Sequence, residues 1–319
     1  MPSRRASSRR SLLFIAPCSM STSESPTGAL PAVQGDLQAR ISGLFIYPVK
    51  SCAGIALEEA ALTETGLDLD RAWMVVDEAG HFVTQREAPR LALVQPTLRR
   101  GDLVLRAPGM LALHLAIDRV ETSARARVWD DEVPAWDMGA VAAQWFSDFL
   151  GRPLRLVRFD PEHRRLSSMK WTGGVEALNQ FSDGFPLLVA SQASLDGLNQ
   201  RLQAAGHAPV GMARFRPNLV LDGIEAHEED RLGHLLVETG EPASPVRLQA
   251  VKPCSRCTIP LVDPATALSD PAVGDTLQAY RSLPAMDGAV CFGMNLIIRA
   301  GEGATLRVGQ TVQADWRFD

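Results

Sequence analysis

The sequence predicts an α+β protein in which β-strands dominate and are divided between two β-rich units. Short runs of alternating apolar and polar residues fill most of the 319 positions, whereas helical periodicity is confined to two segments. The chain also carries 25 Gly and 21 Pro, which end strands and form the turns between them. With 46% hydrophobic residues, it is long enough to bury full cores without disulfide bridges.

The strands of the first unit are predicted from Ile41 onward. Residues 41–50 are mostly extended, and residues 72–85 form a hairpin around a turn at 77–80. The stretches 103–117 and 124–137 continue the pattern with alternating faces. We expect these segments to build a barrel-like unit.

A helix is predicted directly after these strands. Val141, Trp145 and Phe149 recur every four residues, and Gly151 followed by Pro153 ends the segment. This spacing predicts a stripe of side chains that packs against a core, rather than a binding site for a ligand.

The second half of the chain combines one further helix with strands. A polar stretch at 160–177 lacks a clear period and predicts a domain boundary or a lid. After a strand at 185–191, Ser191 caps a helix that ends at Gly206. All later periodic segments predict strands.

These patterns divide the chain into three parts. The N-terminal residues are rich in Ser and Arg and lack hydrophobic periodicity, which predicts a disordered extension at 1–38. We expect an N-terminal domain at 39–160 and a C-terminal domain at 161–319.

Composition excludes several classes of protein. The net charge of −5 gives no overall basic surface for nucleic acid, and no apolar run approaches the roughly 18 residues that span a membrane. Five cysteines are an odd number, which predicts reduced thiols in a cytosol-like compartment and hence a cytoplasmic protein. No glycine-rich nucleotide motif follows a strand, so electrons for any redox reaction are expected from a partner protein.

The strongest local signal is the sequence KPCSRC at 252–257. Two thiols three residues apart with a cation between them favour a metal or redox function. A structural zinc site would need further ligands, such as Cys52, Cys291 or scattered histidines. A dithiol redox pair requires a helix start, whereas Pro253 and Thr258 favour a strand and a turn. Zinc binding, a dithiol pair and buried inert cysteines all stay open on this motif alone.

Several separate motifs together resemble a known family. They are YPVKSCAG at 47–54, LDRAWMV at 69–75, VTQREAPR at 83–90, FSDGFP at 181–186, RFRPN at 214–218, KPCSRC at 252–257 and VDP at 262–264. Their order and spacing resemble the MOSC domain and its N-terminal β-barrel domain, in the group of amidoxime-reducing components and bacterial YcbX-type proteins. The resemblance begins near Ile41 and implies a MOSC-type β-barrel packed against an N-terminal barrel-like domain.

The resemblance implies a molybdenum enzyme whose pterin cofactor carries no attached nucleotide. In that family the second cysteine of CSRC binds molybdenum, which assigns Cys257 as the metal ligand and the catalytic residue. A soft thiolate suits this metal. The positions matching the cofactor site are Lys50, Ser51, Arg71, Asp183, Arg216, Asn218, Ser255, Arg256 and Cys257. Turn or ion-pair roles are expected for Arg86 and Asp263, and Thr258 is left unassigned.

The implied function is the reduction of small N-hydroxylated compounds, such as amidoximes, hydroxylamines and N-hydroxylated bases. Because no ferredoxin domain follows the second domain, the expected electron donor is a separate ferredoxin, cytochrome b5-type protein or flavin reductase. An alternative is a carrier of the molybdenum cofactor or of sulfur, in which Cys257 bears a persulfide. A zinc-stabilised binding module is a third alternative.

Overall fold

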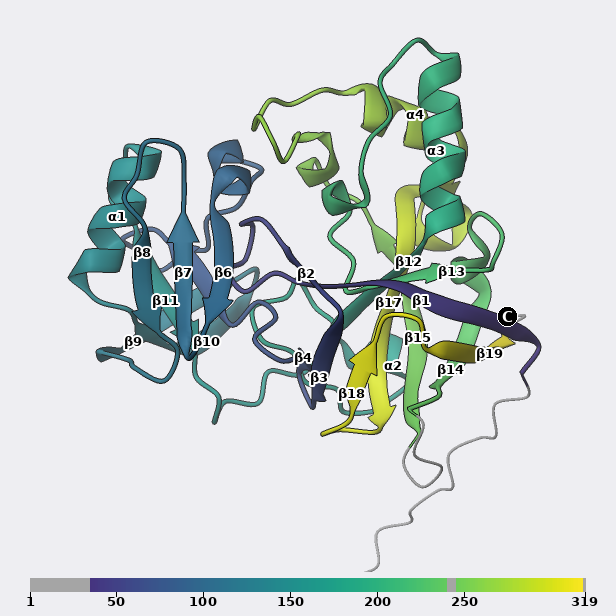
Figure 1. Cartoon of the computed structure of the whole chain (residues 1–319), viewed down its shortest axis with the longest axis horizontal. Coiled ribbons are helices and arrows are strands. Elements are labelled where there is room, and N and C mark those ends of the chain that lie inside the picture. Colours follow the sequence, from purple (N-terminus) through teal and green to yellow (C-terminus); the bar gives the residue numbers. More distant parts are fainter. Residues whose placement is uncertain (1–34, 240–244, 318–319) are drawn as a thin grey trace, which may run out of the picture. The chain divides into compact units, whose positions relative to one another are not determined.

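Seven strands close into a β-barrel in which the first strand of the chain pairs with the last (Figure 1). The computed structural model describes residues 35–239 and 245–317, so Cys18 and most of the expected extension at 1–38 lie outside the described residues. Around the barrel the strands run in the order β12 (Leu187–Ser191), β13 (Leu219–Asp222), β1 (Leu37–Ile46), β19 (Thr311–Trp316), β14 (Leu232–Val237), β15 (Val246–Ser255) and β17 (Ala289–Ala300). The pairing of β17 with β12 closes the ring.

The barrel is held together by an apolar interior and by a close approach at its seam. Ile41, Val189 and Leu296 are among the interior side chains with no exposed surface. Gly293 lies at the seam with φ +80°, and a Cβ placed there would stand 2.6 Å from the carbonyl oxygen of Val189. Because glycine alone accommodates both this φ and this approach, a single residue lets β17 reach β12.

Strands from the N-terminal part pack on the barrel. β2 (Ile55–Leu57) pairs with β1, while β3 (Glu59–Thr63) pairs with both β4 (Gly66–Leu67) and the C-terminal strand β18 (Thr305–Arg307). The buried side chains of β3 belong to the same apolar cluster as the barrel interior. Residues 37–67 therefore pack with the barrel, while the domain limits given above stay a prediction.

The other N-terminal strands form two sheets. One sheet has the order β5 (Trp73–Val76), β11 (Arg155–Phe159), β10 (Asp131–Asp137) and β9 (Thr122–Val128), and the other contains β6 (Gln95–Arg99), β7 (Asp102–Arg106) and β8 (Leu113–Ala116). The strands predicted at 103–117 and 124–137 are present as β7–β8 and β9–β10. The return arm of the hairpin predicted at 72–85 is reduced to one bridge between Val76 and Phe82.

Helix α1 (Ala140–Leu150) packs against β11 and confirms the helix predicted there. Trp145 and Phe149 are buried as expected, but Val141 is 74% exposed, so its assignment to the core stripe is wrong. Each step of four residues rotates a side chain by about 40° around a helix of 3.6 residues per turn, which places Val141 about 80° from Phe149. Ala142 occupies the core-facing position instead.

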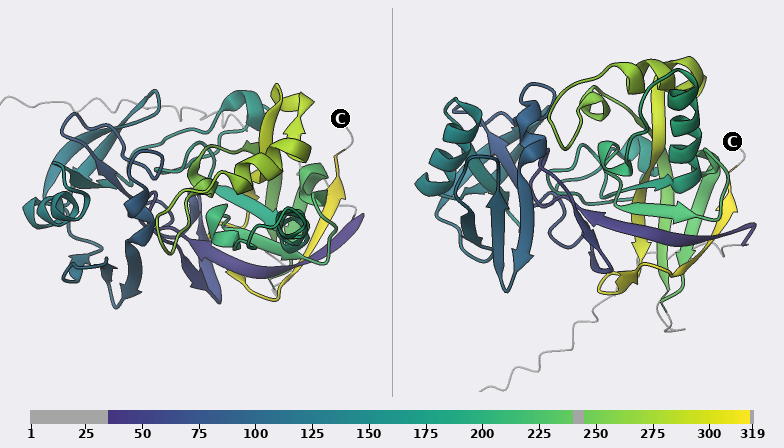
Figure 2. Two further views of the ribbon diagram at one scale, coloured as in Figure 1. Left: turned by 90° about the horizontal axis from the view of Figure 1, so that it is seen from above. Right: turned by 45° about the horizontal axis from the view of Figure 1, so that its top comes forward.

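Two helices lie beside each other over the barrel strands (Figure 2). α3 (Gln192–Ala204) contacts β12 and β13, and α4 (Ala272–Arg281) contacts β17. Leu198 and Leu277 join them in one apolar cluster. Ser191 caps α3 as predicted, since its hydroxyl accepts the backbone N–H three residues later at 3.0 Å. The prediction of strands alone after α3 is wrong at α4.

Short elements complete the described chain. The polar stretch at 160–177 contains the single-turn helix α2 (Met169–Thr172). The others are β16 (Ser282–Leu283) and the 3-10 turns η1 (Pro89–Leu93), η2 (Met212–Arg214), η3 (Glu228–Arg231), η4 (Ile259–Leu261) and η5 (Pro284–Met286). Within the described ranges, no helix has both the length and the apolar character needed to cross a membrane.

Candidate functional site

One pocket collects all of the predicted site residues. They reach it from segments far apart in sequence: the loop after β1, the segment before β5, the loop before β12, the segment before β13 and the end of β15. The predicted residues that line it are Lys50, Ser51, Arg71, Asp183, Arg216, Asn218, Ser255, Arg256 and Cys257. The structure therefore brings these nine residues together, while the role of each stays a prediction.

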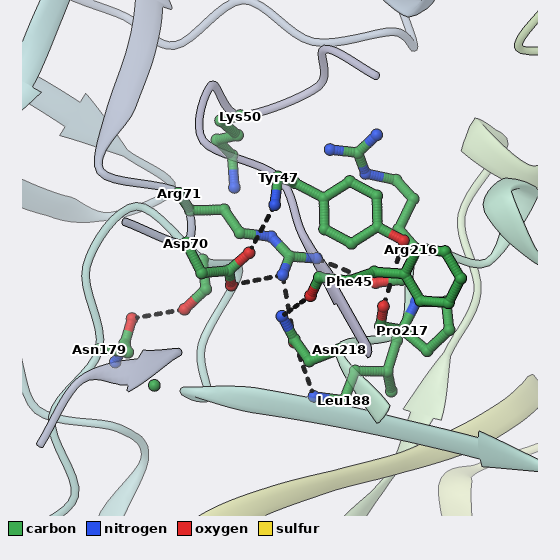
Figure 3. A network of polar contacts seen from close by, with 12 residues as sticks. Phe45, Tyr47, Lys50, Asp70, Arg71, Asn179, Leu188, Arg216, Pro217 and Asn218 are labelled. Atoms are coloured by element: carbon green, nitrogen blue, oxygen red, sulfur yellow. Dashed lines mark hydrogen bonds and ion pairs between the residues drawn. The ribbon is translucent and has the colours of Figure 1, made fainter. Parts of the chain in front are cut away.

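Two arginines of this pocket stack on the ring of one buried tyrosine (Figure 3). The guanidinium carbons of Arg71 and Arg216 stand 4.4 and 4.2 Å from the ring centroid of Tyr47. The Tyr47 hydroxyl donates to the carbonyl of Pro217 at 3.1 Å, and burial raises the pKa of Tyr47 to about 12. The uncharged ring therefore holds two cations close together without neutralising either of them.

Arg71 is fixed by three further contacts. Its Nη1 donates to Asp70 Oδ2 at 2.5 Å and to Asn218 Oδ1 at 3.1 Å, and its Nη2 donates to the Arg216 carbonyl at 3.0 Å. Asp70 also accepts the backbone N–H of Tyr47 at 2.8 Å, as Figure 3 shows. Asp70 thus neutralises one of the two stacked arginines and leaves the charge of the other available.

Two buried arginine nitrogens have no hydrogen-bond partner among the described residues. They are Nη2 of Arg216 and Nε of Arg256. Arg216 also donates from Nη1 to the carbonyl of Cys52 at 2.6 Å, and burial together with the nearby Arg71 lowers its pKa to about 10. Buried donors without partners are rare because each one costs free energy. A bound anion would satisfy these donors.

Three residues of the pocket have left-handed backbone conformations. The φ angle is +67° at Ser51, +51° at Arg71 and +57° at Arg216. For a residue other than glycine this conformation costs about 1–2 kcal/mol. Side-chain contacts offset the cost, and the Ser51 carbonyl, for example, accepts the Gln85 amide at 2.6 Å. Backbone strain that is repeated around one pocket is typical of a binding site.

Lys50 and Asp183 form an ion pair at the pocket wall. Lys50 Nζ lies 2.6 Å from Asp183 Oδ1 and donates to the Phe181 carbonyl at 2.7 Å. Burial lowers the pKa of Lys50, and Asp183 opposes that shift. Burial among protein atoms would raise the pKa of Asp183, but Lys50, Arg86 and Arg71 hold it well below its usual range. Asp183 is therefore ionised at neutral pH, with 59% of its side chain exposed towards the pocket solvent.

A buried arginine holds the loop that carries Asp183. The Nη1 atom of Arg165 donates at 2.6 to 2.7 Å to the Asn179 side chain and to the carbonyls of Gln180 and Ser182. Arg165 belongs to the polar stretch that we expected to be a boundary or a lid. Its observed contacts position the pocket loop.

The cysteine motif lies where β15 gives way to a turn, as predicted. Cys254 Sγ accepts a hydrogen bond from Arg256 Nη1 at 3.0 Å, and Arg256 Nη2 donates to the Phe215 carbonyl at 2.9 Å. Cys257 is exposed, and its sulfur accepts the backbone N–H of Ile259 at 3.5 Å. Cys257 is therefore the more exposed member of the pair.

The other two described cysteines are buried. Burial raises the pKa of Cys52 to about 12 and that of Cys291 to about 11, so both thiols are protonated and unreactive at neutral pH. Across residues 35–239 and 245–317, no group of three or more His, Cys, Asp or Glu side chains could hold a metal ion. The zinc alternative thus finds no ligand set in this part of the chain.

Sequence reasoning missed one charged residue of the pocket wall. Arg86, for which we expected a turn or ion-pair role, lines the pocket, and its guanidinium carbon stands 4.6 Å from the ring centroid of Trp129. Its place in the motif at 83–90 was the available signal. Asp263, in contrast, forms the expected ion pair, with Arg214 at 2.9 Å.

Comparison with known proteins identifies both halves of the chain. Residues 38–153 match the MOSC N-terminal beta barrel domain, and residues 177–313 match the MOSC domain. Mitochondrial amidoxime-reducing component 1 of Mus musculus is 36% identical over 287 residues, which cover 85% of this chain and 81% of that protein. The chain belongs to this family of MOSC-domain proteins.

Two further relatives show the range of the MOSC family. Mitochondrial amidoxime-reducing component 1 of Homo sapiens is 37% identical over 251 residues, covering 76% of this chain and 72% of that protein. Molybdenum cofactor sulfurase of Bos taurus is 28% identical over 265 residues, which cover 77% of this chain but 29% of that protein. The resemblance predicted from the motifs is thereby confirmed.

Proposed function

We propose that this protein is a molybdenum-cofactor-dependent reductase of N-hydroxylated compounds that receives its electrons from a separate protein. The observation that carries the proposal is the pocket itself. Residues of five distant segments line one pocket, which combines paired arginines, an ionised carboxylate and an exposed cysteine. The names of the amidoxime-reducing relatives support the reaction class.

The chemistry of the pocket fits the proposed cofactor. A pterin cofactor without a nucleotide carries a terminal phosphate, a hydrogen-bonding ring and a metal that accepts a thiolate. The pocket offers cations, hydroxyl groups and a sulfur for these parts. The unpartnered N–H groups of Arg216 and Arg256 are donors that phosphate or pterin acceptors would satisfy. The fit therefore rests on unsatisfied donors as well as on charge.

Different pocket residues would bind different parts of the cofactor. Cys257 would provide the thiolate ligand, and the N–H of Ile259 stabilises negative charge on its sulfur. Arg216 would bind the phosphate with its available charge, and Arg71, which donates to the Arg216 carbonyl, would position it. Asp183 would accept N–H groups of the pterin. When bound, the cofactor supplies the two-electron reduction of an N–O bond.

The remaining predicted residues act around these groups. Asn218 has both ends of its side chain engaged, since Oδ1 accepts from Arg71 and Leu188 and Nδ2 donates to Phe45. We therefore give it the task of positioning Arg71. Ser51, Ser255 and Arg256 would donate to the cofactor directly.

The overall reaction sets the number of electrons that the donor protein must supply. Two electrons and two protons convert an N-hydroxylated group into the N–H compound and water. We propose a ferredoxin, a cytochrome b5-type protein or a flavin reductase as the donor of the electrons, and the cytoplasm as the compartment.

A carrier function is the second candidate, because Cys257 is exposed and one relative is named molybdenum cofactor sulfurase. A carrier would bear a persulfide on Cys257 and would catalyse no N–O reduction. Mass spectrometry of metal-free protein separates the two candidates, since a persulfide adds about 32 Da to the Cys257 peptide. An unmodified peptide in protein that reduces amidoximes rules out the carrier.

The test of the reductase is anaerobic turnover of benzamidoxime with a chemical reductant, using protein loaded with molybdenum. We expect stoichiometric formation of benzamidine by the wild type and loss of at least two orders of magnitude in rate for Cys257→Ala. Wild-type protein that holds molybdenum and pterin but forms no benzamidine would contradict the proposal.

A further inference from the structure

A second pocket adjoins the proposed cofactor pocket. The two share Asp183, Gly184 and Phe185 as a common wall. Trp129 and Lys252 line the second pocket and do not line the first, within the part of the chain that the structure describes. The second pocket therefore lies next to the cofactor site but is built from its own residues.

Trp129 occupies a backbone position at which tryptophan is unfavourable. It begins the two-residue loop between β9 and β10, with φ +56°, where glycine or asparagine is favoured. Its ring is 5.2 Å from that of Phe82, and the side chain is 48% exposed. A bulky aromatic that is strained, held in place and still exposed beside a pocket contributes little to folding. These features fit a residue that contacts a ligand.

Lys252 supplies the charge of this second pocket. The chain has lysine at positions 50, 170 and 252 alone, and Lys252 Nζ stands 5.0 Å from the ring centroid of Trp171. Among the described side chains, none forms an ion pair with Lys252. Lys252 is half-buried, and water screens a partly buried charge less than an exposed one, which strengthens its attraction for an anion.

The acidic residues of the second pocket do not cancel this charge. Asp131 pairs with Arg165 at 2.8 Å, and Asp183 pairs with Lys50 at 2.6 Å. Asp130 has no ion pair in the described ranges, but it is exposed at the hairpin tip, where solvent screens its charge. The half-buried cation therefore dominates the recognition of a charged ligand.

We propose that the second pocket binds the body of the substrate, and that Lys252 selects N-hydroxylated aromatic compounds that carry an anionic substituent. The ring of the substrate lies against Trp129, Leu166 and Phe185, and the carboxylate or phosphate on that ring faces Lys252. This inference rests on the proposed reductase function, because the shared wall would place the N-hydroxyl group in the cofactor pocket.

The test compares benzamidoxime with its 3- and 4-carboxylated derivatives on the holoenzyme. Dissociation constants are measured by calorimetry without a reductant, and kcat/KM is measured with one. We expect the wild type to bind a carboxylated derivative about tenfold more tightly, and Lys252→Met to remove that preference. Lys170→Met is the matched control, because Lys170 lies 5.6 Å from the same Trp171 ring without lining the pocket. This control should keep the preference.

A second variant tests the aromatic wall without disturbing the loop. Trp129→Gly suits the left-handed φ, so it should fold and should weaken binding of all three compounds by a similar factor. Equal effects of the two lysine variants, or equal affinities of the wild type for all three compounds, would overturn the inference. Absence of turnover would instead contradict the proposed function, since the dissociation constants are obtained without it.

Discussion

The barrel interior and the proposed cofactor pocket differ in polarity, in backbone conformation and in how fully their polar groups are hydrogen-bonded. The interior is apolar and fully buried, and its strands pair in a closed ring. The pocket contains arginines with left-handed backbone conformations, N–H groups that lack partners among the described residues, and an exposed cysteine. A fold whose sequence agrees with its structure elsewhere tends to break local rules where it binds ligands. This difference indicates which residues stabilise the fold and which residues are available to bind a ligand.

The largest effect is expected at the seam of the barrel. Gly293→Ala would place a Cβ 2.6 Å from the Val189 carbonyl oxygen and should lower the free energy of unfolding by about 2–4 kcal/mol. Gly288→Ala is the control, because its φ of +78° is similar but no atom lies within 4 Å of the added Cβ. Urea unfolding measures both variants. Equal losses would show that the φ angle, rather than the seam contact, makes glycine necessary.

A smaller effect, on binding rather than folding, is expected at the stacked arginines. Arg216→Met should reduce cofactor affinity by about tenfold or more, because a charge-assisted hydrogen bond contributes about 1.5–3 kcal/mol. It should lower the stability of the apoprotein only slightly, because the loss of the hydrogen bond to the Cys52 carbonyl is offset in part by relief of the repulsion by Arg71 that helps to lower the pKa of Arg216. The measurement is pterin content after reconstitution, with thermal unfolding of the apoprotein.

Arg214→Met provides the matched control for that experiment. Arg214 lies in the same motif but pairs with Asp263 and donates to the carbonyls of Pro260 and Leu261. Its loss should lower stability and leave pterin content unchanged. If Arg214→Met lost pterin and Arg216→Met lost stability instead, Arg214 would be the residue that binds the cofactor and Arg216 the residue that stabilises the fold.

The smallest effect concerns the ion pair of Lys50 and Asp183. Because the pKa of Asp183 is lowered in the folded protein, the unfolded chain binds more protons in acid, and the pair loses its contribution as pH falls below about 4. The stability difference between wild type and Asp183→Asn should therefore shrink between pH 5 and pH 2. We expect it to stay under about 1 kcal/mol, because Asp183 is solvent-exposed. A difference that is constant with pH would contradict the lowered pKa.

Local signals in the sequence predicted the parts of the fold that depend on neighbours in the chain. Ser191 and the leucines of α3 follow helical spacing, so that helix could be predicted from its cap and its period. α4 was missed because Gly274 interrupts a short pattern with few apolar positions. The pairing of β1 with β13 and β19 could not be predicted, since strand partners are chosen by contacts between distant segments.

The residues that line the pocket were predicted more completely than the pairing of the strands. The reason is that these residues lie in short local motifs, whereas strand pairing depends on distant segments. Motifs such as RFRPN at 214–218 resemble those of a known family, so the nine residues that line the pocket could be named before their positions were known. Sequence alone did not reveal that Tyr47 holds two arginines or that Arg165 supports the Asp183 loop. Both contacts depend on the folded arrangement of separate segments.

The most direct test of the central claim is the molybdenum and pterin content of protein made in a host that synthesises the cofactor. We predict nearly one molybdenum and one pterin per chain in the wild type, both lost in Cys257→Ala and both retained in Cys254→Ala. Wild-type protein that folds but contains neither molybdenum nor pterin, or a Cys257→Ala variant that keeps both, would contradict the account.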